Sequence, residues 1–129
     1  MFEVTVEVTF SSGHYLREYH GKCENPHGHN YRVHVTLAGE TLDSSGLLLD
    51  FKQLKEVLRP TVAYLDHQMI NDLDPFTTLN PSAENLAHYF FERTREGVKS
   101  LSGGRVHVSA CAVYETDTSA ATYRGVSER

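Results

Sequence analysis

The sequence predicts an α+β domain, in which four strands form an antiparallel sheet and two helices cover one face of it. Apolar and polar residues alternate over 2–10, 31–37 and 106–114, a pattern typical of strands that are buried on one face. A shorter segment at 120–125 is expected to add a fourth strand. Between the second and third strands, apolar residues recur at helical spacing in two segments. Paired strands at both ends with helices between them favour an antiparallel sheet with its helices on one face.

A polar segment separates the first two strands. Residues 11–28 are rich in Gly, His and Ser, so we expect a long irregular loop there. Such a loop in a small domain usually carries function. The second strand is expected to end near Gly39, and 43–46 has the composition of a turn.

Two helices follow. Asp50 is expected to cap the first helix, because an Asp side chain accepts the free N–H groups of a first turn. Pro60 interrupts the apolar repeat and predicts a kink or a break. Residues 66–81 are expected to form a second loop. The second helix is predicted to start near Ser82 and to close at Gly103-Gly104.

Composition excludes several classes of protein. A chain of 129 residues has the size of one domain, so we expect 1–129 to form a single domain. The net charge of −5 argues against a nucleic-acid partner, which usually selects a basic surface. No apolar run approaches the roughly 20 residues that span a bilayer, and the alternating N-terminus is unlike a leader, so no membrane partner is expected. Two cysteines, Cys23 and Cys111, without an export signal predict reduced thiols and a cytoplasmic location.

Histidines are concentrated near the first loop. His27 and His29 are two residues apart, so on a strand both side chains point the same way. His14 has the parity of the inward row of the first strand. Neighbouring strands would then bring three imidazoles together, and three protein ligands with an open position are the pattern of a catalytic zinc site. Cys23 is a possible fourth ligand, which would make the site closed and structural.

Two further features have both a chemical and a purely structural interpretation. Asp66 and His67 are adjacent, and an Asp can orient an imidazole, although His67 also suits a helix C-terminus. Glu115 lies at the end of the third strand, either as a surface residue or as an acceptor for a ligand with paired N–H donors. Its predicted row on that strand also contains His107, Ser109, Cys111 and Val113.

Several motifs in one order resemble the family of 6-pyruvoyl-tetrahydropterin and 6-carboxytetrahydropterin synthases. The matching segments are 10–14, Cys23-X-X-X-His27-Gly28-His29, 46–51, 65–67, 80–87 and 115–116, so the resemblance covers nearly the whole chain. It implies a tunnelling fold (T-fold) that assembles as a homohexamer, with active sites between subunits. It also implies a pterin substrate, 7,8-dihydroneopterin triphosphate.

The resemblance assigns a role to each candidate residue. His14, His27 and His29 would hold zinc, and Cys23 would be the general base rather than a ligand. Asp66 and His67 would complete its proton relay, Glu115 would anchor the pterin ring, and Ser82 would help to line that pocket.

The product depends on the segment around Cys23. Three residues separate Cys23 from His27, which resembles the bacterial carboxy type of the queuosine (7-deazaguanine) pathway, an enzyme that releases acetaldehyde and triphosphate. Glu24 follows Cys23 directly, and a related subgroup uses a Glu near this position to make 6-hydroxymethyl-7,8-dihydropterin for folate. Three alternatives therefore stay open: this folate-branch activity, 6-pyruvoyl-tetrahydropterin synthesis, and a metal- or pterin-binding oligomer without catalysis.

Overall fold

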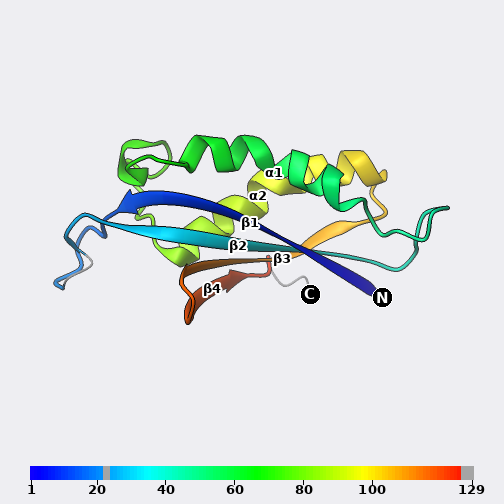
Figure 1. Ribbon diagram of the computed structural model, residues 1–129, viewed down its shortest axis with the longest axis horizontal. Helices are drawn as coiled ribbons and strands as arrows, with labels where there is room; N and C mark the ends of the chain where they lie inside the picture. Colours follow the sequence, from blue (N-terminus) through cyan, green and yellow to red (C-terminus); the bar gives the residue numbers. More distant parts are fainter. Residues whose placement is uncertain (22–23, 126–129) are drawn as a thin grey trace.

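A four-stranded antiparallel sheet with two long helices on one face forms the molecule (Figure 1). The computed structural model describes residues 1–21 and 24–125. Its elements are β1 (Phe2–His14), β2 (His27–Gly39), α1 (Phe51–Leu65), the 3-10 helix η2 (Ile70–Asp72), α2 (Ala83–Ser102), β3 (His107–Thr116) and β4 (Ser119–Tyr123). The strands lie in the order β1-β2-β3-β4, and the predicted α+β class and element order are confirmed. Within the described ranges, no helix combines the length and the apolar character needed to cross a bilayer.

The first two strands are longer than predicted. β1 continues to His14 and β2 begins at His27, so the loop between them covers 15–26 instead of 11–28. Backbone pairing explains the difference, because the polar residues 11–14 pair with 27–30 and a strand ladder needs only backbone groups. The side chains of Ser11 and Asn30 add a hydrogen bond of 2.7 Å across the two strands. The loop bounds of 11–28 predicted from composition were therefore wrong.

The first helix begins where it was predicted. The Asp50 side chain accepts a hydrogen bond of 2.8 Å from the backbone N–H of Lys52, which makes it the N-cap of α1. The helix continues through Pro60 without the predicted break. Pro60 and Glu56 both lie on the exposed side of α1. The Glu56 carbonyl that lacks a helical partner therefore faces water, which lowers the cost of the proline.

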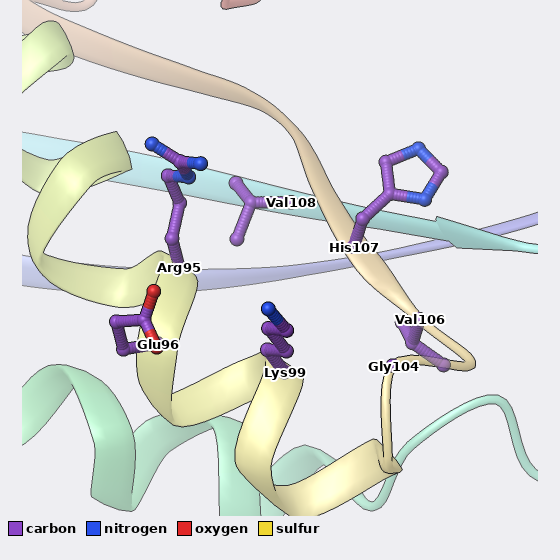
Figure 2. A pocket seen from close by; sticks show the side chains of 7 residues that line it. All are labelled: Arg95, Glu96, Lys99, Gly104, Val106, His107 and Val108. Carbon is purple, nitrogen blue, oxygen red and sulfur yellow. The ribbon is translucent and has the colours of Figure 1, made fainter.

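The second helix also begins and ends where it was predicted. The Ser82 side chain accepts a hydrogen bond of 3.1 Å from the backbone of Asn85, and Gly103 closes α2 with φ 62°. A hollow of about 220 Å³ lies between the last turns of α2 and the start of β3 (Figure 2). Arg95 and Lys99 of α2 and His107 of β3 line it, and none of the predicted site residues does.

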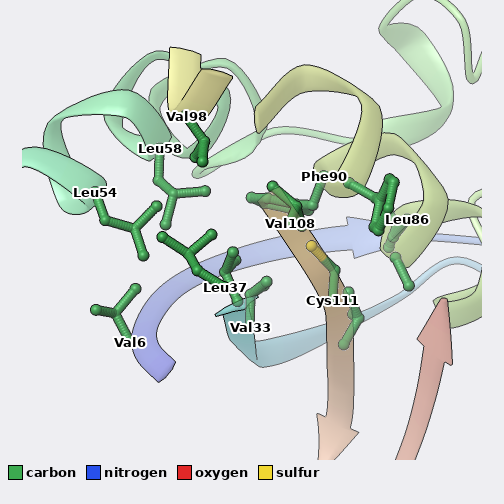
Figure 3. Close-up of a cluster of buried hydrophobic side chains, with 14 of the residues drawn as sticks. Val6, Val33, Leu37, Leu54, Leu58, Leu86, Phe90, Val98, Val108 and Cys111 are labelled. Atoms are coloured by element: carbon green, nitrogen blue, oxygen red, sulfur yellow. The ribbon is translucent and has the colours of Figure 1, made fainter. Parts of the chain in front are cut away.

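The core fills the space between the helices and the inner face of the sheet (Figure 3). Its members come from every layer and include Val6, Val33, Leu37, Leu54, Leu58, Leu86, Phe90, Val98, Val108 and Cys111. Burial raises the pKa of the Cys111 thiol to about 12, so this cysteine is a protonated core residue.

A β-bulge changes the predicted row of β3. Leu37 pairs with Val108 and Thr36 pairs with Ala110, so Ser109 is an extra residue without a partner on β2. Val108 consequently joins Cys111 and Val113 on the buried face, while His107 is exposed. The prediction that His107 and Ser109 share the row of Glu115 was wrong, because alternation does not continue through a bulge.

One buried and one exposed leucine of α2 provide a matched pair of substitutions that tests this packing. Leu86 is 0% exposed and Leu101 is 45% exposed. We expect Leu86→Ala to lower the free energy of unfolding by about 2–5 kcal/mol through lost burial and a residual cavity. Leu101→Ala should cost about 0.5 kcal/mol or less, as a surface substitution. Urea denaturation at one fixed protein concentration measures both, and equal losses would contradict the observed position of the core.

Candidate functional site

Pairing between β1 and β2 brings three histidines together at one end of the sheet. His14 lies opposite His27, and His29 lies opposite Ser12, so all three side chains occupy one face. The Nε2 atoms of His14 and His27 are 3.0 Å apart, and one ring nitrogen from each histidine lies within 4.8 Å of the other two. The imidazoles meet on the inner face of the sheet, as their parity predicts.

The hydrogen bonds of two rings decide where their lone pairs point. Nδ1 of His14 lies 2.7 Å from the carbonyl oxygen of Pro81, and Nδ1 of His27 lies 2.8 Å from that of Asn25. A carbonyl only accepts, so each Nδ1 carries the proton and each Nε2 carries a lone pair. Two lone pairs then face one another at 3.0 Å. This arrangement is repulsive between neutral rings unless a cation lies between them.

The third ring completes a donor set that fits a metal ion. In the part of the chain that the structure describes, Nε2 of His29 is buried and has no hydrogen-bond partner. A buried nitrogen without a partner is costly, which makes it a natural ligand atom. Tetrahedral zinc with nitrogen ligands at about 2.0–2.1 Å would hold them roughly 3.4 Å apart. The Nε2 atoms of His14 and His27 are 3.0 Å apart, and the three ligand nitrogens lie within 4.8 Å of one another.

Burial favours the neutral form of two of these rings, those of His14 and His29. Burial lowers the pKa of both His14 and His29, because a charged imidazole loses hydration there. The Glu115 carboxylate partly opposes this effect, since its oxygens lie 4.0 Å from Nε2 of His14 and 3.9 Å from Nε2 of His29. Neutral rings retain the lone pairs that a metal requires.

A pocket of about 260 Å³ has both Ser82 and Glu115 in its wall. Glu115 links this pocket to the histidines, because its carboxylate lies 3.9 Å from Nε2 of His29. Its other lining residues are Leu16, Ala83, Glu84, Ser119, Ala120 and Ala121. The Glu115 side chain is 29% exposed, so it can accept hydrogen bonds from a ligand in the pocket. Paired N–H donors suit a carboxylate because they bind both oxygens at once.

Asp66 and His67 form a hydrogen-bonded pair at the outer edge of β1. Their side chains meet at 2.9 Å, and His67 has the left-handed φ of 56°, which brings adjacent side chains together where a helix could not. Asp66 also accepts a hydrogen bond of 2.9 Å from the backbone of Ser11. The His67 side chain is 81% exposed. Across residues 1–21 and 24–125, no hydrogen bond or ion pair joins this pair to the three histidines.

The loop between β1 and β2 carries the other two predicted catalytic residues. Cys23 lies outside the described residues. Glu24 is exposed, and its backbone N–H donates to the carbonyl of Gly21 at 3.1 Å. His34 faces the other side of the sheet, where its Nε2 lies 2.8 Å from Glu7.

The groups that orient the histidine rings could not be predicted from the sequence. The carbonyls of Asn25 and Pro81 fix the tautomers of His27 and His14. A backbone carbonyl leaves no residue-specific signal, and Pro81 is 67 residues from His14 along the chain. Only the tertiary structure brings them together.

Residues 3–126 match the family model described as 6-pyruvoyl tetrahydropterin synthase. The chain belongs to this family. It is 32% identical over 128 residues to 6-carboxy-5,6,7,8-tetrahydropterin synthase of Bacillus subtilis, covering 95% of this chain and 85% of that protein. It is 31% identical over 137 residues to human 6-pyruvoyl tetrahydrobiopterin synthase, covering 95% and 91% of the two chains.

Solved structures agree with this assignment. The structure of 6-pyruvoyl tetrahydropterin synthase from Caenorhabditis elegans superimposes with a TM-score of 0.79 at 30% identity, covering 98% of each chain. The predicted T-fold and family are therefore confirmed. The named relatives are tetrahydropterin synthases, which are lyases, and this protein is an enzyme of that class.

The Asp66 contacts lead to a pH-dependent prediction. Hydrogen bonds from the Ser11 backbone and from His67 lower the pKa of the Asp66 carboxyl. A carboxyl with a lowered pKa stabilises the fold above its unfolded pKa of about 4, and this contribution is lost as the pH falls through the folded value. We expect Asp66→Asn to lower the urea midpoint at neutral pH and the difference from wild type to shrink on acidification. A difference that is constant with pH would contradict this role.

Proposed function

We propose that this enzyme is a zinc-dependent lyase that converts 7,8-dihydroneopterin triphosphate to 6-carboxy-5,6,7,8-tetrahydropterin, with release of acetaldehyde and triphosphate. The main support is the convergence of His14, His27 and His29 beside a pocket whose wall contains Glu115. Membership of a tetrahydropterin synthase family supports the substrate class.

Each site residue has a role in this proposal. The three histidines hold zinc through nitrogen atoms, with the tautomers of His14 and His27 set by backbone carbonyls. When bound, zinc supplies Lewis acidity to the side-chain hydroxyls of the substrate, which eases proton loss from the neighbouring carbons. Glu115 accepts the paired N–H donors of the pterin ring, and Ser82 borders the same pocket.

Cys23 is the proposed general base, and the Asp66–His67 pair is its proton relay. The pair is well suited to passing a proton, since the Asp66 carboxylate orients the imidazole at 2.9 Å. His67 is exposed within one chain and is not bonded to the histidine cluster of that chain. A homohexamer with active sites between subunits would allow the pair of one subunit to serve the thiol of another.

The choice of product rests on the segment before His27. Its three-residue gap from Cys23 favours the carboxy product over the pyruvoyl product. Overall identity does not separate the two, since the Bacillus subtilis and human relatives match at 32% and 31%. Formation of 6-pyruvoyl-tetrahydropterin is therefore the second candidate function.

The metal assignment predicts the zinc content of variants. Purified wild type should retain about one zinc ion per chain after dialysis, because three converging imidazoles form the site. His29→Ala should lose most of it, while His34→Ala, on the opposite sheet face, should retain it. Elemental analysis measures both variants. Full retention by His29→Ala would contradict the three-histidine site.

The catalytic assignment predicts that Cys23→Ala abolishes turnover and keeps its zinc. Loss of a general base costs about 10²–10⁴-fold in rate. Zinc-loaded protein is incubated with 7,8-dihydroneopterin triphosphate, and pterin products and acetaldehyde are identified by mass. Loss of zinc from Cys23→Ala would instead indicate a closed four-ligand site. Metal or pterin binding by wild type without release of triphosphate would indicate a non-catalytic oligomer.

The same assay distinguishes a catalytic role of Glu24 from that of Cys23. Under the carboxy proposal, Glu24→Ala should release acetaldehyde as wild type does. A 6-hydroxymethyl-7,8-dihydropterin product that persists in Cys23→Ala and disappears in Glu24→Ala would instead support the folate-branch activity.

A further inference from the structure

The backbone just beyond His14 is held by two asparagine side chains instead of by a strand. Asn71 accepts from the N–H of Tyr15 and donates to its carbonyl, both at 3.0 Å. Asn80 makes the same pair of bonds with Arg17, at 2.9 and 3.0 Å. A primary amide has one acceptor and a donor in the geometry of a peptide group, so each asparagine replaces a strand partner.

These bonds extend a ladder that begins earlier on the free edge of β1. Ser11 bonds to Asp66 and His67 through its N–H and carbonyl, and the N–H of Gly13 donates to the Gln68 carbonyl at 2.9 Å. Alternate residues 11, 13, 15 and 17 are therefore all bonded to the segment 66–80. The intervening residues Ser12 and His14 point inward, so the ladder fixes the backbone on both sides of His14.

Arg17 ties the same segment from the opposite direction. Its guanidinium donates to the carbonyl of Phe76 at 2.9 Å and to those of Asn71 and Leu79 at 3.4 Å each. These three carbonyls occupy an arginine that would otherwise be a candidate for binding the substrate triphosphate. The Arg17 side chain thus holds the segment 71–80 against 15–17.

Asn80 connects this ladder to the His14 ring itself. Its own carbonyl accepts a hydrogen bond of 2.9 Å from the Asn85 side chain, and the next carbonyl, that of Pro81, receives Nδ1 of His14. His14 is therefore connected to Asn80 in two ways. Its backbone continues to Arg17, which is hydrogen-bonded to the Asn80 side chain, and its ring is hydrogen-bonded to Pro81, the next residue after Asn80. Both the backbone and the ring of His14 are positioned by the segment that contains Asn80.

We propose that Asn80 is a positioning residue for the metal ligand His14, acting through the Arg17 backbone and the Pro81 carbonyl. This inference rests on the proposed zinc site. Outer partners of metal ligands typically change metal affinity by about 10–100-fold when they are replaced. Asn80→Ala removes both hydrogen bonds to the Arg17 backbone. Asn80→Asp keeps the acceptor for the Arg17 N–H, but it replaces the donor by an oxygen that faces the Arg17 carbonyl.

The test measures zinc affinity by competition with a chromophoric chelator and records the visible spectrum of the cobalt-substituted protein. We expect both Asn80 variants to bind zinc about 10–100-fold more weakly than wild type and to show an altered cobalt spectrum. Thr94→Val is the control for lost stability, because it removes a buried hydrogen bond to the Phe90 carbonyl within α2. Thr94→Val should bind zinc as wild type does. The thermal unfolding midpoints of the metal-free Thr94 and Asn80 variants show whether they have lost similar stability.

Three outcomes would overturn the inference. If the Asn80 variants are folded and keep wild-type zinc affinity and cobalt spectrum, Asn80 does not position His14, although the metal site stands. If Thr94→Val weakens zinc binding equally, the effect is one of general stability. If wild type binds no zinc, or His14→Ala binds it equally well, the proposed metal site itself fails.

Discussion

The antiparallel pairing of β1 with β2 is the constraint on which the rest of the structure depends. The register that places Phe10 opposite Tyr31 also places His14 opposite His27. Phe10 and Tyr31 are buried and stacked with ring centroids 4.7 Å apart, so the apolar part of the two strands fixes the position of the polar part. A slip of one residue would turn one strand's histidines to the opposite face. Hydrophobic burial therefore sets the geometry of the site.

The features that could be predicted from the sequence are those set by local periodicity. Alternation identified the strands, and the cap Asp50 marked the start of the first helix, because its side chain satisfies an N–H group of the first turn. The start of the second helix near Ser82 was also predictable. The convergence of the three imidazoles followed from parity on paired strands. Two motifs, Asp66-His67 and Glu115, can be singled out from residue type alone, but their distances to other groups depend on the tertiary structure.

The features that could not be predicted depend on contacts between distant segments. The loop after Phe10 seemed irregular from its composition, yet backbone pairing with 27–30 continues the strand. The bulge at Ser109 has no local signal, because a single extra residue looks like ordinary alternation until its partner strand is known. The carbonyl of Pro81 and the amide of Asn80 act on residues more than sixty positions earlier in the chain. Their roles follow from packing and not from residue type.

The bulge in β3 has a consequence for how this protein family can vary. Ser109 has no counterpart on β2, while Val108 and Ala110 on either side of it retain theirs. Deleting that residue would make the pairing of β3 with β2 regular and keep the same residues facing inward from Val108 to Glu115. Loss of this one residue therefore leaves the orientation of the Glu115 carboxylate unchanged. Elsewhere in β3 the same change would reverse every later side chain. Evolution can therefore alter the length of this strand at one place without disturbing the pocket.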